Sequence, residues 1–99
     1  MDNLTGQQRK FLRAQAHSLE PSVLVGKQGI TDALIASVSE ALEAHELIKV
    51  KFNDFKLEKV ALTAEIAERA SAHVAGIVGN IAILYRAQSD EAKRRIVLP

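Results

Sequence analysis

Apolar side chains recur along the chain with two spacings, and the change from one to the other separates helices from strands. The helical spacing of three or four residues predicts helices at residues 5–19, 31–46 and 56–72. Short apolar or alternating runs predict strands at residues 22–25, 47–52, 73–78 and 81–86. The order α-β-α-β-α-β-β predicts an α+β domain with a four-stranded mixed sheet.

Cap and turn residues mark the ends of several of these elements. Thr5, followed three residues later by Gln8, has the pattern of a capping box at the start of the first helix. Pro21 prevents this helix from continuing, and Thr31 is a typical N-cap for the second helix. Gly79-Asn80 has the composition of a two-residue hairpin turn, so the last two strands are predicted to pair.

Length and composition indicate one small domain over residues 1–99. We place its core in residues 1–86, followed by a polar, basic segment at 87–99 that is expected to be mobile up to residue 95. The absence of cysteine excludes disulfides and a thiol nucleophile, and it fits a cytoplasmic protein. No run approaches the roughly 20 apolar residues of a membrane span, and the N-terminus lacks the pattern of a secretion signal. We therefore expect a soluble monomer that does not associate with membranes.

The most distinctive motif is Gly26-Lys27-Gln28-Gly29, which lies between a predicted strand and a predicted helix. Glycine lets the backbone turn tightly and approach a ligand without an intervening side chain. The free amides and the positive dipole end of the following helix would point to the same place. This arrangement suits a phosphate, and some RNA-binding modules use a Gly-x-x-Gly loop to hold the sugar-phosphate backbone.

Basic residues are concentrated in the first helix, although the whole chain is nearly neutral, with 13 Lys and Arg against 12 Asp and Glu. Arg9, Lys10, Arg13 and His17 share one side of this helix. Arg9 and Arg13 are four residues apart, a like-charge spacing that costs an isolated helix roughly 0.2–0.5 kcal/mol. Because folding offers no reason for this cost, we expect an anionic partner, with a solvated basic face as the alternative. Further basic residues that could extend this surface are Lys49, Lys51, Arg86 and the run Lys93-Arg94-Arg95.

The second helix carries the opposite charge. It contains no Lys or Arg, and its periodicity places four acids on an exposed face: Asp32, Glu40, Glu43 and Glu46. The molecule is therefore predicted to have a basic and an acidic side, which would orient it on a polyanion. The acidic face also leaves open a different function, that of an adaptor which binds a basic protein.

The chain has no pattern typical of catalysis or metal binding. The glycine loop lacks the other residues of a nucleotide-binding P-loop, and His45-Glu46 has Lys49 where a zinc-protease helix has its second histidine. His17, His45 and His73 lie on different predicted elements without the spacing of metal ligands. We expect no enzyme activity, no cofactor, no bound metal and no small-molecule substrate.

Few aromatic residues are available for contacts with RNA bases. Phe11 and Phe52 fit the apolar pattern of the core, whereas Phe55, in a turn, and Tyr85 are better placed for exposure. Readers of single-stranded RNA usually stack bases on exposed rings. Recognition is therefore predicted to depend mainly on phosphates and shape.

Several segments together are similar to one known family. They are LEPSVLVGKQGIT at residues 19–31, AHELIKVK at 44–51, Val78-Gly79 and Leu84-Tyr85-Arg86. These segments resemble the CRM domain, named for chloroplast RNA splicing and ribosome maturation, and above all its stand-alone bacterial members of the YhbY type. The likeness extends over nearly the whole chain, including residues 96–99.

The resemblance implies a fold similar to the C-terminal domain of bacterial translation initiation factor three. It also implies RNA binding through Gly26, Lys27, Gln28 and Gly29, and association with ribosomal RNA in precursors of the large subunit. One departure is Asn80, because relatives often carry a basic residue in this hairpin. A KH-type RNA-binding domain is the other interpretation of the loop, and it would require a helix at residues 22–25. For the adaptor alternative, the resemblance implies a basic ribosomal protein as the partner.

Overall fold

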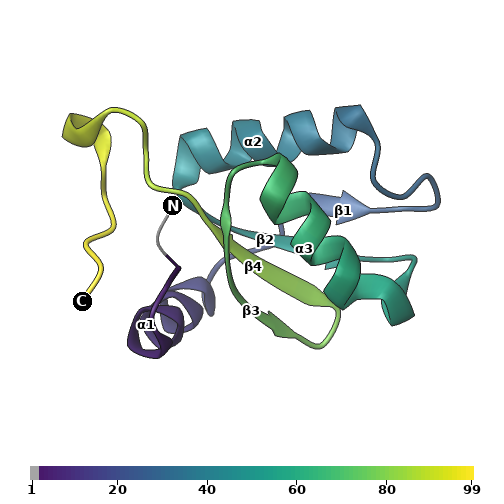
Figure 1. Cartoon of the computed structure of the whole chain (residues 1–99), viewed down its shortest axis with the longest axis horizontal. Helices are drawn as coiled ribbons and strands as arrows, with labels where there is room; N and C mark the ends of the chain where they lie inside the picture. The colour runs from purple at the N-terminus through teal and green to yellow at the C-terminus, as the bar shows by residue number, and fades with distance from the viewer. Residues whose placement is uncertain (1–2) are drawn as a thin grey trace.

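The structure is a computed structural model that describes residues 3–99, and its centre is a four-stranded sheet (Figure 1). The strands are β1 (Val23–Val25), β2 (Leu47–Phe52), β3 (His73–Val78) and β4 (Ile81–Tyr85). Their order across the sheet is β1-β2-β4-β3, with β1 parallel to β2 and with β4 antiparallel to both of its neighbours. The predicted mixed sheet is confirmed, with β4 ending one residue before the expected position.

Three helices cover the two faces of the sheet, which confirms the predicted order of elements: α1 (Gly6–Ala16), α2 (Asp32–His45) and α3 (Lys59–Arg69). α1 packs on one face, and α2 and α3 pack on the other (Figure 1). The larger core lies beneath α2 and α3 and includes Val38, Leu42, Ile48, Phe52 and Leu84. The smaller core lies beneath α1 and includes Leu12, Ala16, Leu47, Ile83 and Tyr85. None of the helices within residues 3–99 is both long enough and apolar enough to cross a membrane.

The predicted N-caps are confirmed. At α1, the Thr5 hydroxyl accepts a hydrogen bond from the Gln8 amide at 3.1 Å, and the Gln8 side chain accepts one from the Thr5 amide at 3.0 Å. At α2, the Thr31 hydroxyl accepts from the Leu34 amide at 3.0 Å. These bonds satisfy amides that the first turn of a helix leaves without partners, so both helices begin where the sequence predicts.

α1 ends at Ala16, three residues before the predicted end. The Lys49 ammonium group, on β2, donates to the carbonyl oxygen of His17 at 3.4 Å and to that of Leu19 at 2.9 Å. Both carbonyls follow the last helical residue, Ala16, so Lys49 fixes the segment that leaves α1 to the sheet.

The third predicted helix is divided and shortened. Phe55 adopts a left-handed conformation, with φ 57°, so residues 56–58 form a separate 3-10 turn, η1 (Lys56–Glu58), before α3 begins. At the other end Ser71 has φ 54°, and the Ala72 amide donates to the Ala67 carbonyl at 2.8 Å. This Schellman-type bond ends α3 before the predicted residue 72.

The C-terminal segment is held by Glu46, contrary to its expected mobility. Glu46 is 2% exposed. Its carboxylate accepts hydrogen bonds from the amides of Gln88 at 2.9 Å, Arg95 at 2.7 Å and Ile96 at 3.2 Å. We call these three hydrogen bonds the tail latch. Burial alone would raise the pKa of Glu46, but these donors and the nearby charge of Arg94 outweigh it and lower the pKa. Beyond the tail latch, Ile96 and Leu98 pack on the smaller core, and the tail (yellow in Figure 1) runs along the left end of the molecule from the side of α2 toward α1.

Candidate nucleic-acid interface

Three loops lie together at the end of the sheet where β1, β2 and β3 finish, because these three strands run in the same direction. The amides of Asn53 and Asp54 donate to the Val25 carbonyl at 3.0 and 3.2 Å, which ties the loop after β2 to the end of β1. The Phe52 amide donates to the Asn80 carbonyl at 2.8 Å, which ties β2 to the hairpin. We call this region, made of residues 26–31, 53–58 and 79–80, the loop edge; it lies at the right of Figure 1.

The Gly26–Gly29 loop is a tight turn with its polar side chains outside. The Gly29 amide donates to the Gly26 carbonyl at 3.0 Å, and Gly29 has φ 69°, a conformation that favours glycine. Lys27 and Gln28 are exposed. A Cβ atom at Gly26 would meet no atom within 4 Å, so the space over its backbone is open to a ligand.

The loop leads directly into the N-terminus of α2. Thr31 caps the Leu34 amide, and the first-turn amides before it have no acceptor within the helix. Asp32 places a carboxylate at this end, where it would oppose a bound anion. Its Oδ1 atom is 2.6 Å from Arg69 Nη2 on α3, so an arginine offsets that negative charge.

A shallow groove runs beside the loop. It has a volume of about 290 Å³ and lies between the glycine loop and one side of α2. Leu24, 55% exposed on the edge strand, lines it together with Thr31 and Ser37. The groove therefore combines an apolar surface with hydroxyl groups and a nearby cation, Lys27.

Lysines surround the loop edge from several elements: Lys27, Lys51, Lys56 and Lys59. Lys51 lies on the face of the sheet that α1 partly covers, paired with Leu24 on β1 and Ile81 on β4. Lys59 Nζ donates to Asn80 Oδ1 at 3.2 Å. The Gly79-Asn80 turn has no basic residue, and Lys59 of α3 places a positive charge beside it. Lys56 and Lys59 were not among the predicted site residues, because only the parallel arrangement of the strands brings their segment to the loop.

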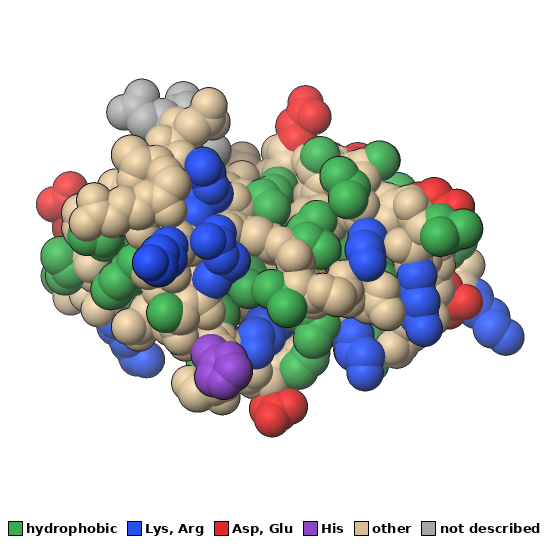
Figure 2. Space-filling model, turned by 90° about the horizontal axis from the view of Figure 1, so that it is seen from below, with side chains coloured by type: hydrophobic (Ala, Val, Ile, Leu, Met, Phe, Trp, Pro, Cys, Tyr) green, Lys and Arg blue, Asp and Glu red, His purple; other side chains and the backbone are tan. Residues whose placement is uncertain are grey.

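The basic side chains of α1 have folding contacts that the sequence did not reveal. Arg9 Nη1 donates to the Leu4 carbonyl at 2.7 Å, and Arg13 Nη1 donates to the Ala75 carbonyl at 3.0 Å. The expectation that folding offers no reason for the Arg9 and Arg13 pair was therefore wrong. Both arginines are nevertheless exposed, as is Lys10. Figure 2 shows Lys and Arg side chains spread over this face of the molecule, with apolar side chains between them.

The two α1 arginines point to different parts of the surface. Arg13 lines a small hollow of about 110 Å³ with Lys49 and Ile81, next to Lys51 on the sheet. Arg9 instead lines a hollow at the β3 side of the sheet, which it shares with Glu68. Only Arg13 is therefore continuous with the loop edge.

Arg86 is part of the internal framework. Its guanidinium group donates to the Ser39 hydroxyl at 3.0 Å, the Ser39 carbonyl at 2.8 Å and the Ala70 carbonyl at 2.8 Å. It also lies 3.4 Å from a carboxylate oxygen of Glu43. These contacts join α2, the end of α3 and the end of β4, so the structure gives Arg86 a stabilising role away from the loop edge.

The expected acidic face of α2 is formed in part, because Asp32, Glu40 and Glu43 are exposed and only Glu46 is buried. Glu46 is buried in the tail latch, Glu43 lies beside Arg86 and accepts from the Ser89 hydroxyl at 2.9 Å, and Asp32 is paired with Arg69. The adaptor hypothesis therefore loses Glu46 but keeps the exposed Glu40 and Glu43, and it stays a prediction. The KH interpretation is wrong, because β1 is a strand and the glycine loop joins a strand to a helix.

Of the aromatic residues, Phe52 is fully buried and Tyr85 is 5% exposed, whereas Phe55 is 41% exposed at the loop edge. The expected exposure of Phe55 is confirmed and that of Tyr85 is wrong. Burial raises the pKa of Tyr85, and the Glu46 carboxylate adds to this shift. The Tyr85 ring stacks on His73, with 6.4 Å between ring centroids, so both rings belong to the packing beneath α1.

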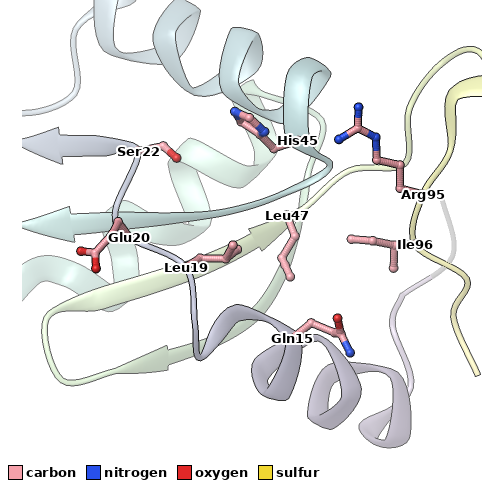
Figure 3. Close-up of a pocket in the computed structure, with 8 residues that line it drawn as sticks. All are labelled: Gln15, Leu19, Glu20, Ser22, His45, Leu47, Arg95 and Ile96. Atoms are coloured by element: carbon pink, nitrogen blue, oxygen red, sulfur yellow. The ribbon is translucent and has the colours of Figure 1, made fainter.

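A hollow of about 340 Å³ lies at the opposite end of the sheet (Figure 3). Leu19, Leu47 and Ile96 form its apolar part, and His45 and Arg95 lie at its rim. Within residues 3–99 no group of three or more His, Cys, Asp or Glu side chains is arranged to hold a metal ion.

Comparisons with known proteins agree on one family. The family described as the CRS1 / YhbY (CRM) domain matches residues 4–86. The chain is 39% identical over 97 residues to the Bacillus subtilis protein named "Probable RNA-binding protein YqeI", covering 97% of this chain and 99% of that protein. It is 40% identical over 95 residues to a Haemophilus influenzae protein named "RNA-binding protein", covering 94% of each. The solution structure of a hypothetical protein from Staphylococcus aureus superposes with a TM-score of 0.79 at 32% identity, covering 97% of this chain and 99% of that one.

Proposed function

Because this chain belongs to the CRS1 / YhbY (CRM) domain family, we propose that it is a non-catalytic RNA-binding protein that binds ribosomal RNA in precursors of the large subunit and assists their assembly. The observation that carries the proposal is the Gly26–Gly29 loop, whose open backbone stands between the N-terminus of α2 and several lysines. The names of the relatives support RNA as the partner. The resemblance to the YhbY-type proteins supports the ribosomal target.

In this proposal the loop holds the phosphate backbone. A phosphate over Gly26 would meet backbone amides of the loop and of the first turn of α2, with the positive dipole end behind them. Lys27 supplies a mobile cation at the same place. Such contacts position a nucleic acid without reading its sequence, which is appropriate for a protein with few exposed rings.

The RNA is proposed to continue from the loop edge across the sheet toward α1. Lys51 lies next to the hollow that Arg13 lines, and Lys10 is three residues from Arg13 on the exposed side of the helix. Charges spread along a surface add affinity through counterion release, so neutralising a cation that meets a phosphate lowers the salt dependence of binding. The protein would act as a monomer in the cytoplasm, where ribosomal precursors are assembled.

Sedimentation of tagged protein in a cell lysate tests the proposal at low and raised salt. We expect the wild-type protein to sediment with large-subunit precursors at low salt and to be released by salt. The variant Lys27→Ala/Lys10→Ala removes two cations that have no structural hydrogen bond within residues 3–99, and it should remain at the top of the gradient. Lys93→Ala, an exposed change in the tail, is the matched control and should sediment like the wild type. Wild-type protein that stays at the top at all salt concentrations would contradict the ribosomal target.

A further inference from the structure

Phe55 is the most exposed phenylalanine or tyrosine of the described residues. It is 41% exposed, whereas Phe52, three residues earlier, is fully buried, and Phe11 is only partly accessible. All three phenylalanines and the single tyrosine lie within residues 3–99, so the comparison covers every phenylalanine and tyrosine ring in the chain. Phe55 is therefore more exposed than the other three rings, and the contacts around its side chain decide what function it can have.

The backbone at Phe55 is held in an uncommon conformation. Its φ of 57° and ψ of 37° are left-handed, a region that bulky L-residues rarely occupy. Two backbone hydrogen bonds hold the segment on both sides of Phe55. The Asp54 amide donates to the Val25 carbonyl at 3.2 Å, and the Glu58 amide donates to the Phe55 carbonyl at 3.1 Å. Backbone strain of this kind is frequent at binding sites, where the surrounding fold maintains it.

The strained backbone directs the ring against the glycine loop. A Cβ atom at Gly29 would lie 3.4 Å from Phe55 Cε2 and 3.6 Å from Cζ, so one edge of the ring packs on the backbone of Gly29. The rest of the ring remains accessible, and the exposed Lys56 follows it in the chain. The ring is therefore fixed beside the place where the proposed function puts a phosphate.

We propose that Phe55 is a stacking platform for an unpaired base of the RNA strand whose phosphate is held by the Gly26–Gly29 loop. Base and phosphate of one nucleotide are joined through the ribose, so a strand bound at the loop presents a base within reach of the ring. Aromatic rings accept any base by stacking, whereas the paired bases of a stem are not free to turn toward the ring. The site would thus prefer single-stranded RNA at this position. This inference rests on the proposed function of the loop.

The chain offers a direct reporter, because it contains no tryptophan. In Phe55→Trp, the fluorescence of the single indole should be quenched when a short oligoadenylate binds. An abasic oligomer of the same length has the phosphates without the bases, and it should bind without that quenching. Adding Lys27→Ala to this variant should shift the quenching to higher oligoadenylate concentration.

Affinity measurements on the protein without tryptophan complete the test. Phe55→Ala should weaken oligoadenylate binding by roughly 5- to 150-fold, the equivalent of about 1–3 kcal/mol per stacked base. Binding of the abasic oligomer should not change. Leu57→Ala, at a neighbouring side chain that is 98% exposed, is the matched control and should bind both oligomers like the wild type.

Three results would overturn the inference. The first is oligoadenylate binding to Phe55→Ala at wild-type strength, which would leave RNA binding by the loop intact and remove only the stacking role. The second is full affinity in Phe55→Leu, which would show apolar contact without stacking. The third is a wild-type protein that binds neither oligomer; in that case the phosphate site fails, and the stacking inference falls with it.

Discussion

Arg13 Nη1 donates a hydrogen bond to the carbonyl oxygen of Ala75, at 3.0 Å, and so joins α1 to the irregular part of β3. The register of β3 on β4 shifts between Val74 and Gly76, which leaves Ala75 outside the regular pairing. The Arg13 side chain also occupies the space beside Gly76, where a Cβ atom would lie 2.6 Å from Arg13 Cδ. One arginine therefore links a helix to a β-bulge and remains exposed beside the proposed RNA path.

Arg13→Ala should affect folding as well as binding. Loss of the bond to Ala75 and of the packing on Gly76 is expected to lower the free energy of unfolding by about 1 kcal/mol, the usual contribution of one hydrogen bond. Urea denaturation measures this change. Lys10→Ala removes the same charge from an exposed position, and its stability should stay within about 0.5 kcal/mol of the wild type. Equal stability of the two variants would show that the Ala75 contact has no energetic role.

The two glycines of the loop should respond differently to alanine. Gly29 has φ 69° and lies against the Phe55 ring, so Gly29→Ala should destabilise the fold by about 1–2 kcal/mol, the cost of a left-handed conformation. Gly26 is outside the left-handed region and has open space above it, so Gly26→Ala should unfold like the wild type and bind RNA more weakly. Thermal unfolding together with filter binding separates the two effects. A Gly26→Ala protein with unchanged RNA affinity would show that the ligand does not approach this backbone.

Local signals in the sequence predicted the elements well, because caps and turns act over a few residues. Thr5 and Thr31 cap the helices as expected, and β2 and β3 have the predicted bounds. The periodicity placed Glu46 with the acids of α2, but the helix ends at His45 and the φ of 65° at Glu46 turns the chain so that the carboxylate is buried. A helical pattern cannot show where helical geometry stops.

The site was only partly predictable for a different reason. The Gly26–Gly29 motif is contiguous, so it could be recognised in the sequence. Phe55 lies beside the motif only because β1 and β2 are parallel, and Lys59 reaches the loop edge through its bond to Asn80 in the hairpin. Arg86 leaves the predicted set because three elements converge on its guanidinium group. Both facts depend on topology, which hydropathy and charge patterns do not determine.

Thr63→Val should stabilise the protein. The Thr63 side chain is 1% exposed on α3, and its hydroxyl oxygen has no hydrogen-bond partner among the described residues. Valine has nearly the same shape without the hydroxyl, so the cost of burying an unpaired polar group disappears. We expect the free energy of unfolding to rise by about 1 kcal/mol in urea denaturation. Thr63→Ser, which keeps the hydroxyl and loses a methyl group, is the control and should be less stable than the wild type. Equal or lower stability of Thr63→Val would indicate that the hydroxyl does find a partner.

The tail latch should open in acid. The pKa of Glu46 is lower in the folded protein than its ordinary value of 4.5, because the three amide donors favour the carboxylate. The stabilisation from this group is therefore complete above the ordinary pKa and is lost as the pH falls through the lowered pKa of the folded state. Amide exchange at Arg95 and Ile96 should accelerate over that acidic range, while amides in β2 and β4 stay protected.

Glu46→Gln tests the same latch at neutral pH. Arg95 and Ile96 donate to Oε1 and Gln88 donates to Oε2, so the single acceptor oxygen of the amide can serve only one side, and its NH₂ group faces a backbone donor on the other side without a change in size. Trypsin should cleave at Arg94 and Arg95 in this variant several times faster than in the wild type, and acid should accelerate its tail exchange less. Glu40→Gln removes an exposed carboxylate from α2 and should leave both measurements unchanged. If the two variants behave alike, the packing of Ile96 and Leu98 holds the tail, and the hydrogen bonds to Glu46 do not contribute measurably.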